Sequence, residues 1–328
     1  MKKQWLAMIA LLVVTRSFGQ SLQELKDALE RKEAEVQSLR ERIQVLEREL
    51  TLRQAVQPRP PEAAGLDEED INRALERTLV REGGLVLSPK TFEIEPNFVY
   101  SHLTDDGFER NAYGPGITFR AGLPWRSQLE LALPYVVEYR SLAGVSTHAH
   151  GIGDLTVSLS HQLLSERPFV PGLVGGIAYL ASTGKNTLFE SGPSVALGGG
   201  FDAVQAFLTA VKRADPLVFF GTYTYSHNFS DEKAGLEVDP GNTNSLRVGT
   251  ILATSPNTSL RAAFNVAYFN KTRISGQTIP GSDQTFGLLE FGGSMVLSER
   301  TALDVAVGAG VTSNAPDFRI SVAVPIRF

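Results

Sequence analysis

The residues that come closest to a metal site are His148 and His150, which lie two positions apart and shortly before Asp154. Imidazole and carboxylate groups are common ligands of Zn²⁺. A helical zinc site would require the HExxH spacing, and other zinc sites would require a third nearby histidine; neither occurs around these residues. We therefore expect no metal and no other cofactor, and we interpret this segment as a polar loop.

The segment Ser182–Lys185 has part of the pattern of a phosphate-binding loop. The full pattern requires a glycine five residues before Gly184, where Tyr179 stands, and a hydroxyl residue after the lysine, where Asn186 stands. The sequence also has no GxSxG motif and no cysteine, which excludes that type of esterase and every thiolate nucleophile or disulfide. We therefore expect that the protein is not an enzyme.

Several charged residues stand singly within segments in which every second residue is apolar. They are Glu93, Glu95, Arg120, Glu130, Asp154, Arg261 and Arg319. Charges scattered in this way along many strands are typical of the wall of a water-filled lumen, so we predict that these residues line a pore. The alternative is that some of the carboxylates belong to an outer-membrane protease or acyltransferase.

The elements that would carry these charges are β-strands. From Lys90 onward the apolar residues recur with a period of two, as in the even-numbered residues from Phe92 to Tyr100 and again from Phe318 to Phe328. Strands of this length span a bilayer when they close into a barrel, because lipid cannot satisfy the backbone groups of an open sheet edge. We predict an all-β transmembrane barrel of about twelve antiparallel strands over residues 85–328.

The predicted connections alternate between short turns and longer polar loops. The short turns are 124–127, 165–169, 212–216, 254–258 and 298–300, and the longer stretches are 102–112, 140–150, 183–194, 230–243, 270–283 and 312–317. Bacterial outer-membrane barrels have short turns in the periplasm and longer loops outside. A soluble β-sandwich would not require this asymmetry, and a soluble lipocalin-like barrel would turn its polar face outward.

A short amphipathic helix is predicted ahead of the barrel, over residues 66–84. Its first turn is acidic, Gly83-Gly84 can end it, and Ile71, Leu75 and Leu79 share one face. A short helix with one apolar stripe needs a surface to pack on, and the barrel is the only large body that follows. We therefore predict that it plugs or caps the barrel.

Residues 20–54 are predicted to form a coiled coil that joins copies of the chain. Its apolar positions lie alternately three and four residues apart, as in a heptad seam, and Arg42 and Glu47 flank the seam at g and e positions. The seam consists of Leu22, Leu25, Leu29, Val36, Leu39, Ile43, Leu46 and Leu50. A lone helix would leave these side chains exposed, because a proline-rich linker, 55–65, follows. The Arg42–Glu47 arrangement resembles a signature of parallel trimers.

The first residues have the features of a secretory signal peptide. Lys2 and Lys3 precede an apolar run from Trp5 to Val14, and small residues follow at Ser17 and Gly19. The run is about half as long as the roughly 20 residues of a spanning helix, so we expect cleavage after Gly19 rather than an uncleaved anchor. The net charge of −5 and the lack of a basic stripe exclude nucleic acid as the expected partner.

Two families of known proteins resemble parts of this sequence. The segment Gly151–Leu155 (GIGDL) and the glycine-rich segment 192–201 resemble the "meta-pathway of phenol degradation"-like outer-membrane transporters. The segments Ala74–Leu87, Phe92–Pro96 and Lys212–Pro216, with Tyr225-Ser226-His227 and the coiled coil, resemble the functional-amyloid secretion channel of pseudomonads.

The second resemblance implies a trimer of twelve-stranded barrels in the cell outer membrane, with a periplasmic coiled coil and a helix that plugs each pore. Ile71, Leu75 and Leu79 would then seat the plug, and Gly83-Gly84 would be its hinge. The implied function is export of an unfolded, amyloid-type polypeptide. The alternatives are a diffusion channel for small, perhaps aromatic, solutes, and a structural protein that tethers the outer membrane through its coiled coil. The expected partners are outer-membrane lipid, further copies of the chain, and the secreted polypeptide or solute.

Overall fold

The computed structural model describes residues 37, 42, 73–105, 107–142, 144–185 and 197–328. By its internal contacts the chain divides into two units, Met1–Gly65 and Leu66–Phe328. The predicted signal peptide, coiled coil and linker lie outside the described residues, except that Gln37 and Arg42 are helical and exposed. The account that follows therefore concerns the second unit.

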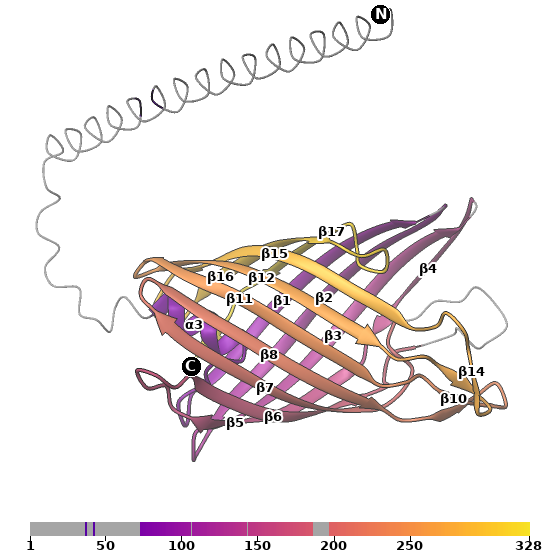
Figure 1. The fold of residues 1–328 in the computed structure, drawn as a ribbon, viewed down its shortest axis with the longest axis horizontal. Helices are drawn as coiled ribbons and strands as arrows, with labels where there is room; N and C mark the ends of the chain where they lie inside the picture. The colour runs from indigo at the N-terminus through magenta and orange to yellow at the C-terminus, as the bar shows by residue number, and fades with distance from the viewer. Residues whose placement is uncertain (1–36, 38–41, 43–72, 106, 143, 186–196) are drawn as a thin grey trace, which may run out of the picture. The chain divides into compact units, whose positions relative to one another are not determined.

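The described residues of this unit form a closed barrel of twelve antiparallel strands, as predicted (Figure 1). Two of the twelve are interrupted: β4 and β5 both pair with β3, and β17 and β18 both pair with β1, which closes the barrel. In chain order the elements are β1 (Phe92–Asp105), β2 (Phe108–Leu123), β3 (Ser127–Leu142), β4 (Val145–Ile152), β5 (Leu155–Leu164), β6 (Gly172–Ala181), β7 (Ala203–Ala214), β8 (Leu217–Asn228), β11 (Thr243–Ser255), β12 (Thr258–Phe269), β15 (Gln284–Val296), β16 (Ala302–Gly310), β17 (Phe318–Ala323) and β18 (Ile326–Arg327).

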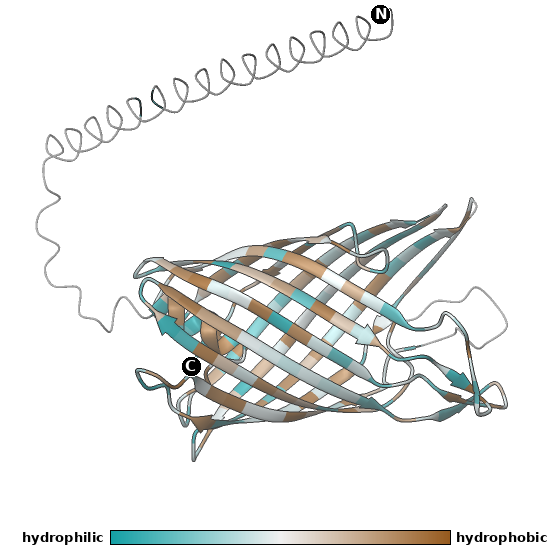
Figure 2. Cartoon of the chain, in the orientation of Figure 1, coloured by the Kyte–Doolittle hydropathy of each residue, from teal (hydrophilic) through white to brown (hydrophobic). Residues whose placement is uncertain are grey.

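The two faces of each strand differ in polarity, and the apolar face is outside. In β1, Phe92 and Phe98 are 56% and 40% exposed, whereas the alternating Glu93 and Glu95 are 3% and 4% exposed. Figure 2 shows the same alternation along the other strands. An outward apolar face and a charged interior are the reverse of a soluble barrel and are suited to lipid outside and water inside. No helix in the described part of the chain is both long and apolar enough to span a membrane.

The two ends of the barrel differ. At one end, here called the turn end, the connections are short: 124–126, 165–171, 215–216, 256–257 and 297–301. At the other, here called the loop end, the predictions of loops at 102–112 and 140–150 are wrong. Strands β1 and β2 stay paired as far as Asp105 and Phe108, and β3 and β4 as far as Leu142 and Val145. The outward residues of 140–150 include His148 and His150 in place of aliphatic side chains, which obscured the period of two.

Two of the predicted loops at the loop end contain strands of their own. Residues 230–243 include β9 (Asp231–Lys233) and β10 (Leu236–Asp239), and residues 270–283 include β13 (Arg273–Ile274) and β14 (Gln277–Thr278). These four strands pair into a small separate sheet, with β10 joined to β13. The loops therefore support each other through backbone hydrogen bonds.

One short helix, α3 (Arg73–Arg81), lies inside the barrel at the turn end (Figure 1). It ends earlier than predicted, because residues 82–84 form a turn, and residues 66–72 lie outside the described part. The amide of Gly84 donates to the carbonyl of Leu79 at 2.8 Å and the amide of Gly83 donates to that of Val80 at 3.1 Å. Gly83 has φ +71°, so these bonds form a Schellman cap, in which glycine is favoured because it has no Cβ.

Candidate functional site

The apolar face of α3 packs on the inner wall of the barrel. Leu79 is fully buried and Leu75 nearly so, in one cluster with side chains of β7, β8, β11 and β12: Val211, Val218, Phe220, Ile251 and Ala263. A hydroxyl pair adds to this contact, since Oγ1 of Thr78 lies 2.8 Å from Oγ of Ser259. Leu75 and Leu79 therefore hold the helix on one half of the wall. Ile71, their predicted partner, lies outside the described residues.

The polar face of α3 meets a group of paired charges that begins on β11 and β12, beside the apolar cluster, and extends round the wall to β1, β2 and β3. We call this group the charged belt; it consists of Glu93, Glu95, Arg120, Glu130, Arg247, Arg261, Glu290, Asp304 and Arg327. Its members come from β1, β2, β3, β11, β12, β15, β16 and β18. Since β11 and β12 carry both kinds of contact, the two faces of the helix together contact the wall from β7 round to β1.

The N-terminal half of α3 is bound to β1, β18 and the last turn. Arg77 lies 3.7 Å from a carboxylate oxygen of Glu93 and donates to the carbonyl of Glu299 at 2.8 Å. Arg327 donates to Glu76 at 2.8 Å and to Glu93 at 3.1 Å. Burial lowers the pKa of the Arg77 guanidinium, and the charge of Arg327 lowers it further, while Glu93 and Glu76 raise it. Arginine keeps its proton in proteins, so Arg77 remains a cation held by its carboxylate neighbours.

The C-terminal half of α3 is bound to β11, β12 and β16. Glu82 accepts a hydrogen bond from Arg247 at 2.9 Å, and its other oxygen lies 3.0 Å from a guanidinium nitrogen of Arg261. Arg81 pairs with Asp304, which Arg261 also contacts at 3.2 Å. The side chains of Glu82, Arg261 and Asp304 are all at least nine-tenths buried. Losing one partner of such a cluster would leave a buried charge uncompensated.

Arg120 organises the part of the belt that does not depend on the helix. Its guanidinium donates to Glu93 at 2.9 Å, to Glu95 at 2.8 Å and to Glu130 at 2.6 Å. These four side chains come from the adjacent strands β1, β2 and β3. They hold three strands in register and present a polar surface to the helix.

Two predicted pore residues lie away from the belt. Asp154 accepts backbone hydrogen bonds from Gly184 at 2.9 Å and Gly199 at 2.6 Å, so it fastens the connection between β6 and β7 and is not an open charge. Arg319 lies on β17 nearer the loop end, where its strand position pairs with Ser101 and Gly308. The other predicted residues, Glu93, Glu95, Arg120, Glu130 and Arg261, all belong to the belt.

Several charged residues of the site were not among the predicted ones. They are Arg77, Arg81 and Glu82 on the helix, and Arg247, Glu290, Asp304 and Arg327 on the wall. The signal for the wall residues was present, because Arg247 stands between Leu246 and Val248, and Glu290 stands between Leu289 and Phe291. The period-two criterion that identified Arg261 applies equally to them.

Four cavities adjoin one another around the helix. A loop-end cavity of about 300 Å³ shares Val99 and Arg319 with a central cavity of about 440 Å³. The central cavity shares Arg81 and Glu82 with a side cavity of about 250 Å³. The side cavity in turn shares Leu85 with a turn-end cavity of about 610 Å³. The series passes the C-terminal end of α3 on the side of β5, β6 and β7.

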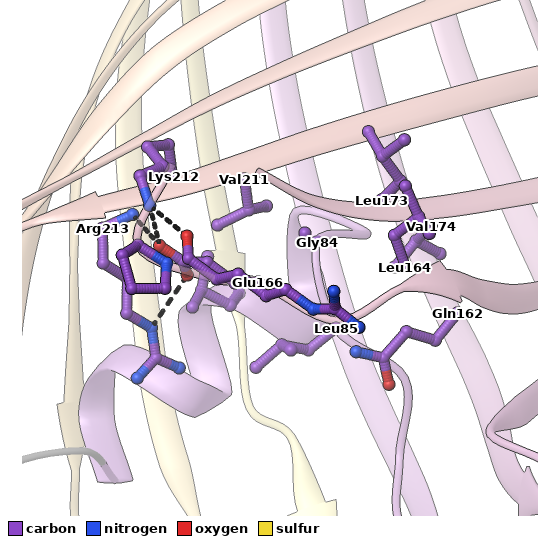
Figure 3. A pocket seen from close by; sticks show the side chains of 14 residues that line it. Gly84, Leu85, Gln162, Leu164, Glu166, Leu173, Val174, Val211, Lys212 and Arg213 are labelled. Carbon is purple, nitrogen blue, oxygen red and sulfur yellow. Dashed lines mark hydrogen bonds and ion pairs between the residues drawn. The ribbon is translucent and has the colours of Figure 1, made fainter. Parts of the chain in front are cut away.

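The turn-end cavity is shown in Figure 3. Its apolar lining includes Leu85, Val174 and Val211. The backbone at Gly84 lies close to Val211, since a Cβ at Gly84 would be 2.4 Å from a methyl carbon of that valine. At its rim Glu166 accepts hydrogen bonds from the ammonium of Lys212 at 3.1 Å and from the amide of Arg213 at 2.8 Å. The lysine and arginine of the predicted turn 212–216 thus fasten the turn between β5 and β6.

At the loop end, Glu138 is fully buried and pairs with Arg110 at 2.8 Å and with Arg140. In the connection between β6 and β7, hydrogen bonds from the amide and hydroxyl of Ser182 and from the hydroxyl of Tyr179 lower the pKa of Asp202 to about 2. Both clusters join neighbouring segments of chain.

The histidines considered as metal ligands are used otherwise. His150 lies 2.8 Å from the hydroxyl of Tyr135, and the ring of His148 is stacked on that of Tyr139 with the centroids 6.0 Å apart. Within the described ranges, no three His, Asp or Glu side chains are grouped as the ligands of a metal ion.

Comparison with known proteins supports the fold. No family model matches the chain. The COG4313 outer membrane channel from Pseudomonas putida F1 is similar in structure, with a TM-score of 0.62 and 13% identity over 74% of this chain and 97% of that one. A match to the translocator domain of the autotransporter NalP from Neisseria meningitidis covers 77% of this chain and 92% of that domain, with a TM-score of 0.46 and 12% identity. The chain therefore has the fold of an outer-membrane β-barrel.

Proposed function

We propose that this protein is an outer-membrane channel gated by α3, with the turn end in the periplasm and the loop end outside. The observation that carries the proposal is the seat of the helix, which is apolar toward β7 and β8, both apolar and ionic toward β11 and β12, and ionic toward β16, β18 and β1. The helix crosses the lumen inside the charged belt. While it stays there, nothing as wide as a polypeptide passes.

The ionic half of the seat suits a gate better than a permanent seal. Buried ion pairs contribute little net stability, because the cost of removing both charges from water offsets their attraction. Water that enters the belt would solvate Glu82, Arg247 and Arg261 when the helix leaves. An all-apolar contact of the same size would resist separation more strongly.

We propose export of an unfolded polypeptide as the function of the open state. A barrel of about eight strands is filled by its own side chains, and twelve strands leave a wider lumen once the helix is out. The support for a polypeptide cargo is the resemblance of segments such as Ala74–Leu87 to the amyloid secretion channel.

A second candidate is a diffusion channel for small solutes that works with the helix seated. The observation in its favour is the series of adjoining cavities of about 250–610 Å³ that passes the helix on the side of β5, β6 and β7. A growth defect on one carbon source with normal surface fibres would favour this candidate, and loss of the fibres alone would favour export.

Deletion of residues 66–82 tests the gate. We expect the variant to have a higher single-channel conductance in planar bilayers, because the helix and its ion pairs are removed while the barrel strands remain. A deletion of the linker 55–65 keeps the helix and serves as the control. Equal conductance of the two variants, with both barrels folded by circular dichroism, would show that α3 is not the plug.

A further inference from the structure

Arg319 differs from the other charged residues inside the barrel. Among the described residues, no carboxylate lies within 4.0 Å of its guanidinium, and its side chain makes no hydrogen bond. Each arginine of the charged belt, in contrast, has at least one carboxylate within that distance. Arg319 is half-buried and lines both the loop-end cavity and the central cavity. It therefore presents to the lumen a positive charge without an ion pair, on which Glu290 acts from beyond that distance.

The loop-end cavity beside Arg319 combines an apolar part with the polar side chains of Ser101, Gln284 and Asn314. Val99 and Leu103 of β1, Phe269 of β12 and Phe286 of β15 line it, with Pro316 from the connection between β16 and β17. Its volume is about 300 Å³, and a dry cavity of about 150 Å³ is large enough to bind benzene. The cavity thus has room for a ring and a short polar group.

The cavity is closed on one side by a fixed connection. The amide of Thr104 on β1 donates to Asp317 at 2.8 Å, and the amide of Gly287 on β15 donates to Thr312 at 2.9 Å. Arg110, the second arginine of the cavity, is balanced by Glu138 at 2.8 Å. Only the charge of Arg319 is therefore available for a ligand among the described lining residues.

We propose that the loop-end cavity binds a small organic acid with one carboxylate and one aromatic ring. The carboxylate would pair with the guanidinium of Arg319, whose fork suits two parallel hydrogen bonds. The ring would lie against Phe269 and Phe286, where aromatic contacts add to the apolar burial. A hydrated inorganic anion has no apolar surface to bury against the two phenylalanines. A neutral aromatic compound has no carboxylate to pair with Arg319.

This proposal deepens the small-solute candidate, since a channel for such acids needs the proposed open path past the helix. Arg319 lines both the loop-end cavity and the central cavity, so an acid bound to it would lie between the loop end and the charged belt. The site would then select anionic aromatic solutes from outside. The binding itself requires only the folded barrel.

Calorimetric titration of the full chain in detergent tests the site. Benzoate is the probe, and benzyl alcohol and acetate each lack one half of the proposed recognition. We expect benzoate to bind at least about tenfold more tightly than either, and Arg319→Gln to weaken benzoate at least about tenfold. Arg319→Lys should restore part of the affinity. Arg273→Gln removes one charge from an exposed position on β13 and should leave binding unchanged.

Equal affinity of benzoate for the parent chain and Arg319→Gln would overturn the proposal, and so would equal affinity of benzoate and acetate. The second result would mean that Arg319 attracts any anion. Circular dichroism and heat-modifiable migration of the variant should match the parent, because Arg319 makes no ion pair that folding would lose. Titration does not depend on flux, so benzoate binding without a conductance change on helix deletion would refute the gate and leave the site standing.

Discussion

At the scale of single residues, the charged side chains of the lumen have two different tasks. Arg120 connects three carboxylates of adjacent strands, so its bonds form with the barrel and stay in every state of the channel. Glu82 connects the helix to Arg247 and Arg261, so its bonds must break if the helix leaves. A substitution at a residue of the second kind, such as Glu82, should therefore change gating and leave assembly of the barrel unchanged.

Glu82→Gln should raise the open probability of the channel. The amide keeps the shape of the side chain but loses charge-assisted bonds that each contribute about 1.5–3 kcal/mol, so the population with the helix displaced should rise about tenfold or more. Single-channel recording in planar bilayers would measure it. Glu237→Gln, at an exposed site on β10, is the matched control and should behave as the parent chain.

The Asp202 carboxylate should hold the connection between β6 and β7 over a wide pH range. Its folded pKa of about 2 lies below the ordinary value of 3.8, so its contribution is present above pH 3.8 and is lost as the pH falls toward 2. Hydrogen exchange of the Ser182 amide, which donates to it at 2.8 Å, should be constant from about pH 7 to 4 after correction for intrinsic rates. Loss of protection already near pH 5 would contradict this assignment, and Asp202→Asn should lower protection throughout.

At the scale of elements, the apolar and the charged side chains of α3 contact different sets of strands that overlap in part. The face of α3 with Leu75 and Leu79 meets β7, β8, β11 and β12, and its charged side chains, with Glu82 just after it, meet β11, β12, β16, β18 and β1. The amphipathic pattern predicted that the helix would pack on the barrel. It could not predict which strands receive it, because several strands offer inward apolar or charged residues.

A disulfide between Thr78→Cys and Ser259→Cys should hold the gate shut. The two hydroxyl oxygens lie 2.8 Å apart and the sequence has no other cysteine, so oxidation should join helix and wall. We expect the oxidised double variant to lose the openings that Glu82→Gln produces, and a reducing agent to restore them. Each single cysteine variant should be insensitive to the oxidant. Openings that persist in the oxidised double variant would mean that solute passes with the helix in place.

At the scale of the whole molecule, the closed barrel isolates a polar interior from an apolar exterior. The lumen admits a buried network of charges because β17 and β18 complete the wall against β1 and exclude lipid. The predicted coiled coil 20–54 would add a second level of organisation by joining several barrels. It lies outside the described residues, so its role remains a prediction from the heptad pattern.

Removal of residues 20–54 should convert an assembly of several chains to single barrels. The heptad seam predicts self-association, and the resemblance of the Arg42–Glu47 arrangement to a signature of parallel trimers implies three chains; the deletion does not touch the barrel strands. Native mass spectrometry of both proteins in the same detergent would measure the change. A trimer that survives the deletion would place the contact between chains on the barrel wall.

The sequence by itself determined the barrel and much of the polar interior, because alternation assigns each strand residue to one face. It also located the end of α3 at Gly83, since the cap needs a residue with positive φ. Only the tertiary structure decided that Asp154 binds backbone amides, that the strands extend over 102–105, 108–112, 140–142 and 145–150, and that Arg319 makes no ion pair among the described residues. Those outcomes depend on which segments meet across the sheet, and the distances between residues remote in sequence are set by closure of the barrel.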